Sequence, residues 1–496
     1  MNMINDSLRK AREFENTYLP NVNRDELPEF HVTGGIGWIN DPNGFSVYKN
    51  EYHLFFQYHP YDVTWGPMHW GHVKTSDFIH WERLPAAIAP DEEYDKDGCF
   101  SGSAIELPDG RHLLMYTGVR NERRKDGQVE TFQTQCIAVG DGVDYEKYEH
   151  NPVITGEDVP AGADVHDFRD PKIRFEDGKY YAVVGNRPAD GSGSIIQYES
   201  EDGFEWNFTS VVAMCHNQFG KMWECPDLFR LDDKDVLLTS VQEMTAMGEE
   251  FHPGNTTICL IGCYDREKHH LVREAVQAVD YGTDFYAPQT LLSLDGRRVM
   301  IAWMQSWESS GSKKAGLPFL GQMILPRELS IRDGRLIQNP VRELEQLRGT
   351  KISYRNVMIC GETTLQGIDG RFIDMTVNIR PASEDSVFRY FKLNVAKDGE
   401  ISTMIRYKPE NNTIRVDRTY SGFPHDIVNA RTVPVRPNQG VIKLRLIMDR
   451  YSLELFVNDG EQAASFVLYT PVSASAISFE AEGTAMLDVE KYDLQL

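Results

Sequence analysis

The spacing of apolar and polar residues changes once, near the start of the chain. Residues 1–20 are predicted to form a short helical lead-in. Beyond them, apolar and polar positions alternate in short runs, which are separated by turns rich in Gly, Asp and Asn. This pattern is typical of β-strands joined in hairpins, so we predict an all-β fold behind the lead-in.

One hairpin unit recurs five times in the first two thirds of the chain. Each copy has a small or acidic opening residue at its first or second position, forms a strand, turns through Asp, Gly or Asn, and ends in a mostly apolar strand. The copies are DPNGFSVYKNEYHLFFQY (41–58), FSGSAIELPDGRHLLMYTG (100–118), RDPKIRFEDGKYYAVVGN (169–186), ECPDLFRLDDKDVLLTS (224–240) and DFYAPQTLLSLDGRRVMIAWM (284–304). Five units of this kind predict a five-bladed β-propeller.

A propeller would bring distant polar residues together, because the first strand of every blade lines one central channel. The opening residues at positions 41, 101, 170, 224 and 284 would then converge, among them Asp41, Asp170 and Glu224. The alternative is a β-sandwich or barrel with irregular hairpins, in which these carboxylates need not meet.

The repeat ends near residue 340, and a different pattern follows. We predict a propeller domain over residues 1–340, a linker over 341–352 and a C-terminal β-sandwich over 353–496. The sandwich is predicted from short alternating strands, for which FIDMTVNIR (372–380) and VIKLRLIMD (441–449) are examples. We find no catalytic constellation in it, and an exposed edge of the sandwich could support a homo-oligomer.

Composition and charge exclude several classes of partner. The formal net charge is −24, which repels phosphate backbones and anionic lipid, so neither nucleic acid nor membrane is an expected partner. A neutral small-molecule substrate fits better, although the charge could equally serve solubility alone. Seven cysteines without a C-x-x-C pair indicate neither a disulfide framework nor a structural zinc site. The N-terminus lacks a signal-peptide pattern and no apolar run is long enough to span a membrane, so a cytoplasmic protein is expected.

Three segments carry candidate chemistry, because each has a carboxyl group at the opening of a predicted blade. Glycoside hydrolysis needs two carboxyl groups, and a third can stabilise the positive charge that develops at the anomeric carbon. In WINDPNG (38–44), Pro42 and Gly44 would hold Asp41 on a rigid bend, beside Asn40; an ordinary turn is the alternative. In FRDPK (168–172), Arg169 can bind sugar hydroxyls and a proline again follows Asp170; here the alternative is a surface ion pair.

The third segment is MWECPD (222–227), where Trp223 and Cys225 flank Glu224. Their apolar character predicts a desolvated carboxyl, which is the property that an acid catalyst needs. The alternative is a buried Glu224 paired with an arginine or lysine. His69 and His72 could form a metal pair, but no carboxylate lies at ligand spacing, so we predict neither metal nor cofactor.

With these motifs, the chain resembles glycoside hydrolase family 32, the invertase and fructanase family. The resemblance runs from about residue 31 to the C-terminus. Its motifs are WINDPNG (38–44), QYHP (57–60), WGPMHWGH (65–72), FSGSA (100–104), FRDPK (168–172), ECPDLF (224–229), DFYAPQ (284–289) and LPREL (325–329). The family fold, a five-bladed propeller followed by a β-sandwich, agrees with the repeat analysis.

The resemblance also implies roles for individual residues. Asp41 matches the nucleophile of a retaining β-fructofuranosidase, Glu224 the general acid/base and Asp170 the transition-state stabiliser. The positions that match the fructose pocket are Asn40, Gln57, Trp65, Phe100, Ser101 and Arg169. Trp303 and Trp307 follow the fifth repeat and are further candidates for substrate contact.

The sequence leaves the leaving group and the acceptor open. HVTGGIG (31–37) and QYHPY (57–61) depart from the common family pattern near the pocket rim. Cleavage of sucrose and short fructo-oligosaccharides is the expected function. The alternatives are sucrose-6-phosphate hydrolysis, for which NERRK (121–125) could supply a basic patch, fructosyl transfer to another sugar, and a carbohydrate-binding propeller without catalysis.

Overall fold

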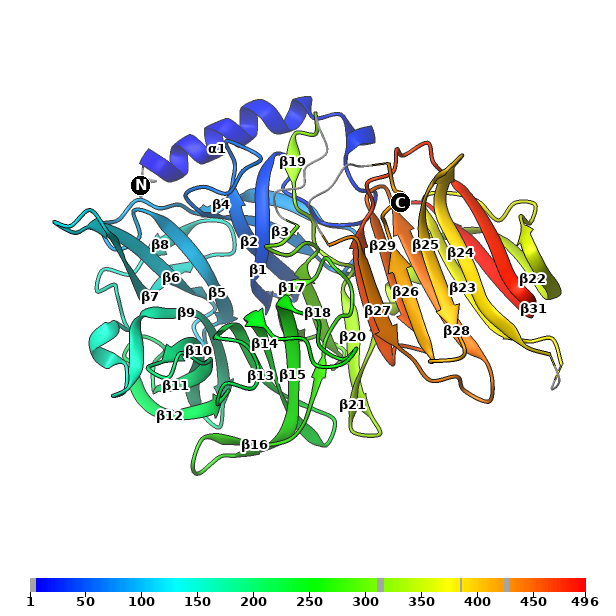
Figure 1. Cartoon of the computed structure of the whole chain (residues 1–496). Helices are drawn as coiled ribbons and strands as arrows, with labels where there is room; N and C mark the ends of the chain where they lie inside the picture. The colour runs from blue at the N-terminus through cyan, green and yellow to red at the C-terminus, as the bar shows by residue number, and fades with distance from the viewer. Residues whose placement is uncertain (1–5, 310–315, 384–385, 423–427) are drawn as a thin grey trace.

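A computed structural model describes residues 6–309, 316–383, 386–422 and 428–496. The predicted lead-in is confirmed as helix α1 (Asp6–Tyr18), which lies over β4 at the outer edge of the first blade (Figure 1). Its Leu8 and Ala11 pack against Ala86 and Ala89. In the residues described, no helix is both long and apolar enough to cross a membrane.

Five small sheets follow the helix. Short 3₁₀ helices lie before the first sheet at Leu19–Asn21 and Arg24–Glu26, between the second and third sheets at Gly156–Asp158, and after the fifth at Arg342–Leu347. The first blade consists of β1 (Gly37–Tyr48), β2 (Glu51–His59), β3 (His69–Thr75) and β4 (Glu82–Ile88), and the second of β5 (Gly98–Glu106), β6 (His112–Arg123), β7 (Val129–Gly140) and β8 (Tyr145–Lys147). The third consists of β9 (Ala163–Glu176), β10 (Lys179–Pro188), β11 (Ser194–Ser200) and β12 (Asn207–Met214), and the fourth of β13 (Met222–Leu231), β14 (Lys234–Met244), β15 (Gly254–Asp265) and β16 (His270–Ala278). The fifth consists of β17 (Tyr286–Leu292), β18 (Arg298–Trp303), β20 (Arg327–Arg332) and β21 (Arg335–Pro340).

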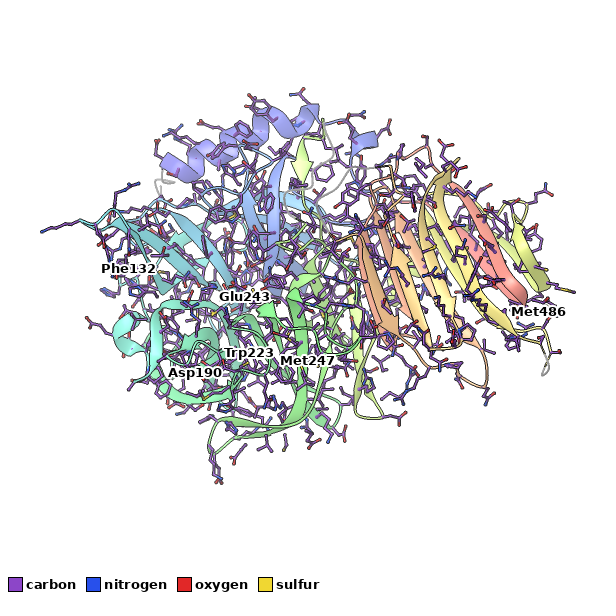
Figure 2. All side chains as sticks on the ribbon, in the orientation of Figure 1. Phe132, Asp190, Trp223, Glu243, Met247 and Met486 are labelled. Carbon is purple, nitrogen blue, oxygen red and sulfur yellow. The ribbon has the colours of Figure 1, made fainter. Side chains whose placement is uncertain are left out.

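The first strands of the five blades form a closed ring, which confirms the predicted propeller. Contacts run from β1 to β5, β9, β13 and β17 and back to β1 (Figure 1). The short strand β19 (Phe319–Leu320) pairs in parallel with β1, and the Gly37 amide donates a 2.8 Å hydrogen bond to the Pro318 carbonyl. This pairing joins the first strand of the propeller to the segment between β18 and β20 of the fifth blade. Trp223, labelled in Figure 2, is fully buried within the ring.

Hairpin turns within the blades follow from local sequence. The two-residue turns at Lys49–Asn50, Asp177–Gly178 and Asp333–Gly334 have positive φ at both positions. Such turns match the twist of the strands that they join, and Asn, Asp and Gly adopt the required conformation most easily. The turn residues that reveal the repeat in the sequence are therefore those that close its hairpins.

The C-terminal residues form a β-sandwich, as predicted. Its strands are β22 (Arg348–Thr363), β23 (Ile373–Pro381), β24 (Phe388–Asp398), β25 (Ile401–Lys408), β26 (Thr413–Asp417), β27 (Ala430–Pro434), β28 (Ile442–Asp449), β29 (Ser452–Val457), β30 (Gln462–Val467) and β31 (Ala476–Leu494). The long strand β31 pairs with β24 in its first half and with β23 in its second, so it passes from one layer to the other. β22 begins inside the segment predicted as a linker.

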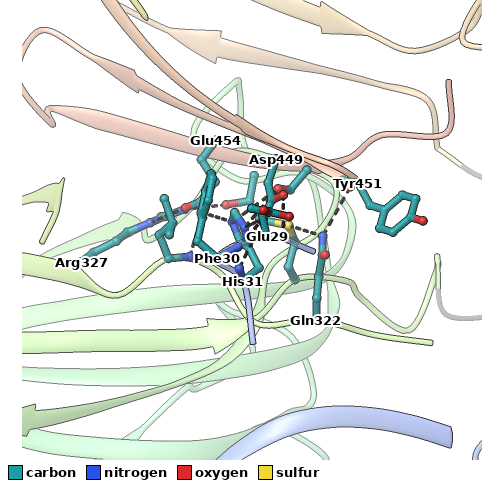
Figure 3. Close-up of polar contacts among 12 residues, drawn as sticks. Glu29, Phe30, His31, Gln322, Arg327, Asp449, Tyr451 and Glu454 are labelled. Carbon is teal, nitrogen blue, oxygen red and sulfur yellow. Dashed lines mark hydrogen bonds and ion pairs between the residues drawn. The ribbon is translucent and has the colours of Figure 1, made fainter. Parts of the chain in front are cut away.

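A buried polar network joins the propeller to this sandwich (Figure 3). The imidazole of His31 lies between two carboxylates of the sandwich, with Nδ1 2.7 Å from Asp449 and Nε2 3.0 Å from Glu454. Arg327 of β20 reaches Glu454 from the other side and also pairs with Asp280 at 2.9 Å. Removing one member of such a buried pair leaves an uncompensated charge, which is strongly destabilising.

His31 makes the stability of this interface depend on pH. Burial lowers the pKa of His31, but its hydrogen bonds to Asp449 and Glu454 and their charges outweigh burial and raise the pKa to about 9. The folded state therefore holds the proton more tightly than the unfolded chain. Its contribution is complete below about pH 6.5 and is lost as the pH rises through about 9. The loss is on the order of 3 kcal/mol, as each pKa unit is worth ~1.4 kcal/mol.

We expect the free energy of unfolding to fall between pH 6.5 and 9 in the wild type, and His31→Gln to flatten this dependence. Urea unfolding followed by fluorescence across the pH range measures it. His80→Gln is the matched control, because His80 is exposed and pairs only with nearby Asp77 in the described structure. An unchanged pH profile in His31→Gln would exclude His31 as the titrating group.

Candidate active site

Every first strand of a blade contains a β-bulge at the propeller axis. The strand registers skip between Ile39 and Pro42, Phe100 and Gly102, Arg169 and Lys172, Glu224 and Asp227, and Tyr286 and Gln289. A proline lies in four of these bulges and Gly102 in the other. Proline has no N–H to donate to a ladder, so a bulge tolerates it. A bulge also redirects side chains.

These bulges correct the alignment of the repeats by one residue. Asp41, Ser101 and Asp170 directly precede the proline or glycine, but in the fourth blade this position belongs to Cys225, not Glu224. Glu224 lies one residue earlier, at the position of Arg169. The expectation that the three carboxylates occupy equivalent positions is therefore wrong for Glu224, although its side chain still reaches the site.

The fifth opening residue, Asp284, does not join the site. It lies before β17, fully buried, and its carboxylate binds the guanidinium of Arg418 in the sandwich at 2.8 Å. The fifth blade instead contributes Tyr286, whose hydroxyl donates a 2.6 Å hydrogen bond to Glu224.

Asp41 is buried and surrounded by donors. Asn40 Nδ2 donates to one oxygen at 3.1 Å, and Ser101 Oγ donates to the other at 2.7 Å. The Asn40 amide is itself fixed by Trp38 Nε1 at 2.7 Å. Burial raises the pKa of Asp41, the hydrogen bonds from Ser101 and Asn40 lower it, and the charge of Glu224 raises it, with a net increase.

Asp170 lies beside Asp41 across the thiol of Cys225. Cys225 Sγ is 3.6 Å from an Asp41 oxygen and 3.5 Å from an Asp170 oxygen, and the Cys225 amide donates to Asp170 at 3.0 Å. Burial raises the pKa of Asp170 and nearby Arg169 lowers it, but the charges of Glu224 and Asp41 add to burial, so the net change is upward. Burial and the same carboxylates raise the pKa of the Cys225 thiol, which keeps it protonated.

Glu224 is buried, as its neighbours predicted, but it is also paired. Arg169 Nε and Nη2 donate to its Oε1 at 3.0 and 2.8 Å, while Tyr286 occupies Oε2. The arginine partner that sequence analysis considered as an alternative is thus Arg169 of the neighbouring blade. Arg169 is buried as well, so it is not part of a surface ion pair.

The remaining predicted pocket residues lie around this centre. Gln57 is buried and donates to the Cys99 carbonyl at 2.9 Å. Trp65 is 49% exposed, and its ring meets that of Phe100 edge to face, with the centroids 6.0 Å apart. Trp303 is buried against Trp38, with ring centroids 5.9 Å apart, so it packs behind the site.

Sequence reasoning did not assign Cys225 and Tyr286 to the site. Both lie in motifs typical of the family, ECPDLF (224–229) and DFYAPQ (284–289). When the repeats are aligned on the proline of the bulge, Cys225 takes the position of Asp170, and Tyr286 takes the position of Glu224. The signal was therefore present in the repeat once it was aligned on proline.

A cavity of about 550 Å³ adjoins Glu224. Its lining consists of Phe100, Arg124, Val129, Glu130, Thr131, Gln133, Asp164, His166, Asp167, Arg169, Arg187, Glu224 and Gln242. It offers mostly polar groups, which suits a ligand rich in hydroxyls. Over the described ranges, no three His, Cys, Asp or Glu side chains are grouped to hold a metal ion. His69 Nδ1 lies 3.0 Å from the Pro67 carbonyl, whereas His72 contacts His53.

Comparison with known families agrees with this geometry. The model of the Glycosyl hydrolases family 32 N-terminal domain matches residues 31–340, and that of the Glycosyl hydrolases family 32 C terminal matches residues 343–494. The chain belongs to glycosyl hydrolase family 32. The resemblance drawn from the motifs is confirmed.

Relatives within family 32 are similar over almost the whole chain. Raffinose invertase and sucrose-6-phosphate hydrolase, both from Escherichia coli, are each 34% identical, with 93% of this chain and 93% of the relative covered. Among solved structures, a mutant Bombyx mori β-fructofuranosidase in complex with sucrose is 31% identical. It has a TM-score of 0.83 and covers 100% of this chain and 99% of its own.

The hydrogen bond from Ser101 supports the ionised form of Asp41. In Ser101→Ala, we expect the pKa of Asp41 to rise further, because a hydrogen bond to the charged form is lost. Titration of ¹³C-labelled aspartate by NMR measures this change, and Ser101→Thr keeps the hydroxyl as a control. If alanine and threonine leave the same titration curve, Ser101 has no such effect.

Proposed function

We propose that this protein is a retaining β-fructofuranosidase of the invertase type, which releases terminal β-fructofuranosyl residues from sucrose and short fructo-oligosaccharides. The observation that carries the proposal is the convergence of Asp41, Asp170 and Glu224 at the propeller axis, beside a polar cavity. Glycoside hydrolysis requires two carboxyl groups with different roles. A binding protein would gain nothing from burying three of them.

Asp41 is the proposed nucleophile. Its carboxylate attacks the anomeric carbon of the fructosyl group, the bond from this carbon to the leaving oxygen breaks, and a covalent fructosyl-enzyme forms. Ser101 and Asn40 donate hydrogen bonds that favour the ionised form of this carboxylate and fix its direction.

Glu224 is the proposed acid and base. It gives its proton to the leaving oxygen in the first step. In the second step it takes a proton from water, which attacks the anomeric carbon and releases fructose and the Asp41 carboxylate. Arg169 and Tyr286 hold the carboxyl group on the side of the cavity.

Asp170 is the proposed stabiliser of positive charge on the fructosyl ring, because it lies beside the nucleophile and does not contact the acid directly in the hydrogen-bond network described. Asn40, Gln57, Trp65, Phe100, Ser101 and Arg169 are the proposed fructose-binding residues. Transfer of fructose to another sugar would pass through the same fructosyl-enzyme as hydrolysis. These residues would therefore bind fructose whether the acceptor is water or a sugar.

We also place the protein in the cytoplasm. All seven cysteines are free, and five of them are buried. Unpaired thiols are typical of reducing compartments.

Purified protein should release fructose from sucrose, and Asp41→Asn should lose at least about 10³-fold in kcat, since a nucleophile is removed. Glu224→Gln should lose about 10² to 10⁴-fold, the usual contribution of a general acid. Fructose is assayed with sucrose, kestose and inulin. Asp295→Asn, an exposed carboxylate on the β17–β18 turn, is the control and should keep full activity. Fructose release that survives in Asp41→Asn would contradict the assignment.

The stereochemical outcome tests the covalent intermediate separately. Two successive displacements at the anomeric carbon give β-fructofuranose as the first product. NMR of the fresh reaction mixture, before the anomers equilibrate, distinguishes it from the α anomer. Initial α-fructofuranose would show a single displacement and remove the nucleophilic role of Asp41.

A further inference from the structure

The cavity beside Glu224 has a wall of paired charges. This wall comes from the β6–β7 hairpin, β7, β9 and β10, and both β7 and β10 lie against β9 (Figure 1). If Glu224 protonates the leaving oxygen, the group that departs with this oxygen must occupy the cavity. Apart from Arg169, which is a proposed fructose-binding residue, the charged groups of the wall then act on the leaving group.

Arg124 is the most exposed of the three arginines in the lining, and Glu130 neutralises it. Arg124 Nε and Nη2 bind both oxygens of Glu130, at 2.8 and 2.6 Å, across the hairpin. This forked geometry is the one by which an arginine would bind a phosphate. His166 Nε2 lies 3.3 Å from the same carboxylate.

Asp167 pairs with the other two arginines of the lining, Arg169 and Arg187. Its carboxylate pairs with Arg187 through one oxygen and with Arg169 Nη1 through the other, at 2.9 Å for Arg169. Arg169 is further bound by Glu224. Each of the three arginines in the lining therefore already has a carboxylate partner.

The lining as a whole has no positive charge left over. It contains three arginines, Arg124, Arg169 and Arg187, and the carboxyl groups of Glu130, Asp164, Asp167 and Glu224. While Glu224 holds the proton that it gives to the leaving oxygen, the other three carboxylates balance the three arginines. A phosphate adds about 1.5 to 2 further negative charges at pH 7 and needs donors that are not already taken.

We propose that this cavity selects neutral sugars as leaving groups and disfavours phosphorylated ones, and that Glu130 sets this preference by occupying the fork of Arg124. The inference rests on the proposed function and specifies its substrate. A neutral sugar can use the carboxylates and guanidinium groups as hydrogen-bond partners without separating the ion pairs. A phosphorylated sugar would have to displace Glu130 from Arg124 and remain beside the other carboxylates.

The test compares kcat/KM for sucrose and sucrose 6-phosphate, which differ only in the phosphate on the leaving group. We expect the wild type to prefer sucrose by at least about 10-fold, a typical effect of one uncompensated charge contact. Glu130→Gln frees Arg124 and should narrow this ratio about 10-fold by raising kcat/KM for sucrose 6-phosphate. Arg124→Gln leaves Glu130 without its arginine partner and should widen the ratio.

Glu122→Gln is the matched control. Glu122 lies on the same hairpin and pairs with Arg120, outside the lining of the cavity, so the same charge change should leave the ratio unaltered. Thermal unfolding of each variant checks that the fold is kept.

The outcomes separate this inference from the function on which it rests. A wild type that cleaves both substrates without preferring sucrose overturns the selectivity and leaves the hydrolase assignment standing. A ratio that does not move in Glu130→Gln and Arg124→Gln removes these residues as its cause. No release of fructose from either substrate would instead refute the proposed function.

Discussion

Three carboxylates held inside the protein, where five strands meet, are the constraint on which the rest of the site depends. Like charges at this distance repel one another, and burial disfavours the ionised form of each carboxyl group further. The protein compensates with one buried guanidinium and a set of neutral donors. Arg169 binds Glu224, while Ser101, Asn40 and Cys225 surround the two aspartates. The residual imbalance appears as raised pKa values at Asp41 and Asp170.

The ring of first strands explains how such different groups reach one point. Each strand carries a bulge at the axis, and the residues on either side of it turn towards the neighbouring blades. The first blade supplies the carboxylate of Asp41 and the second the hydroxyl of Ser101. The third, fourth and fifth blades supply the guanidinium of Arg169, the carboxyl group of Glu224 and the phenol of Tyr286. A common backbone device thus presents unrelated chemistries, so the repeat is preserved in conformation and not in residue type.

The sandwich contributes to this arrangement from a distance. Its Glu454 and Asp449 hold His31, which lies just before β1, and Glu454 also binds Arg327 of the fifth blade. Arg418 holds Asp284 directly before β17. These buried contacts fix the first and last blades, between which the ring closes through β19. The sandwich therefore supports the geometry of a site to which it contributes no catalytic residue.

The sequence by itself determined the fold, because strand period, turn residues and the recurring hairpin are local patterns whose consequences are local. It also identified Asp41, Asp170 and Glu224 as carboxylates that a propeller would bring together. Only the tertiary structure decided what surrounds them. The one-residue offset of Glu224, the hydroxyl of Tyr286, the thiol between the aspartates and the diversion of Asp284 depend on strand register and blade packing. So does the pairing of Arg124 with Glu130, because charges compensate one another through space and not through their order in the chain.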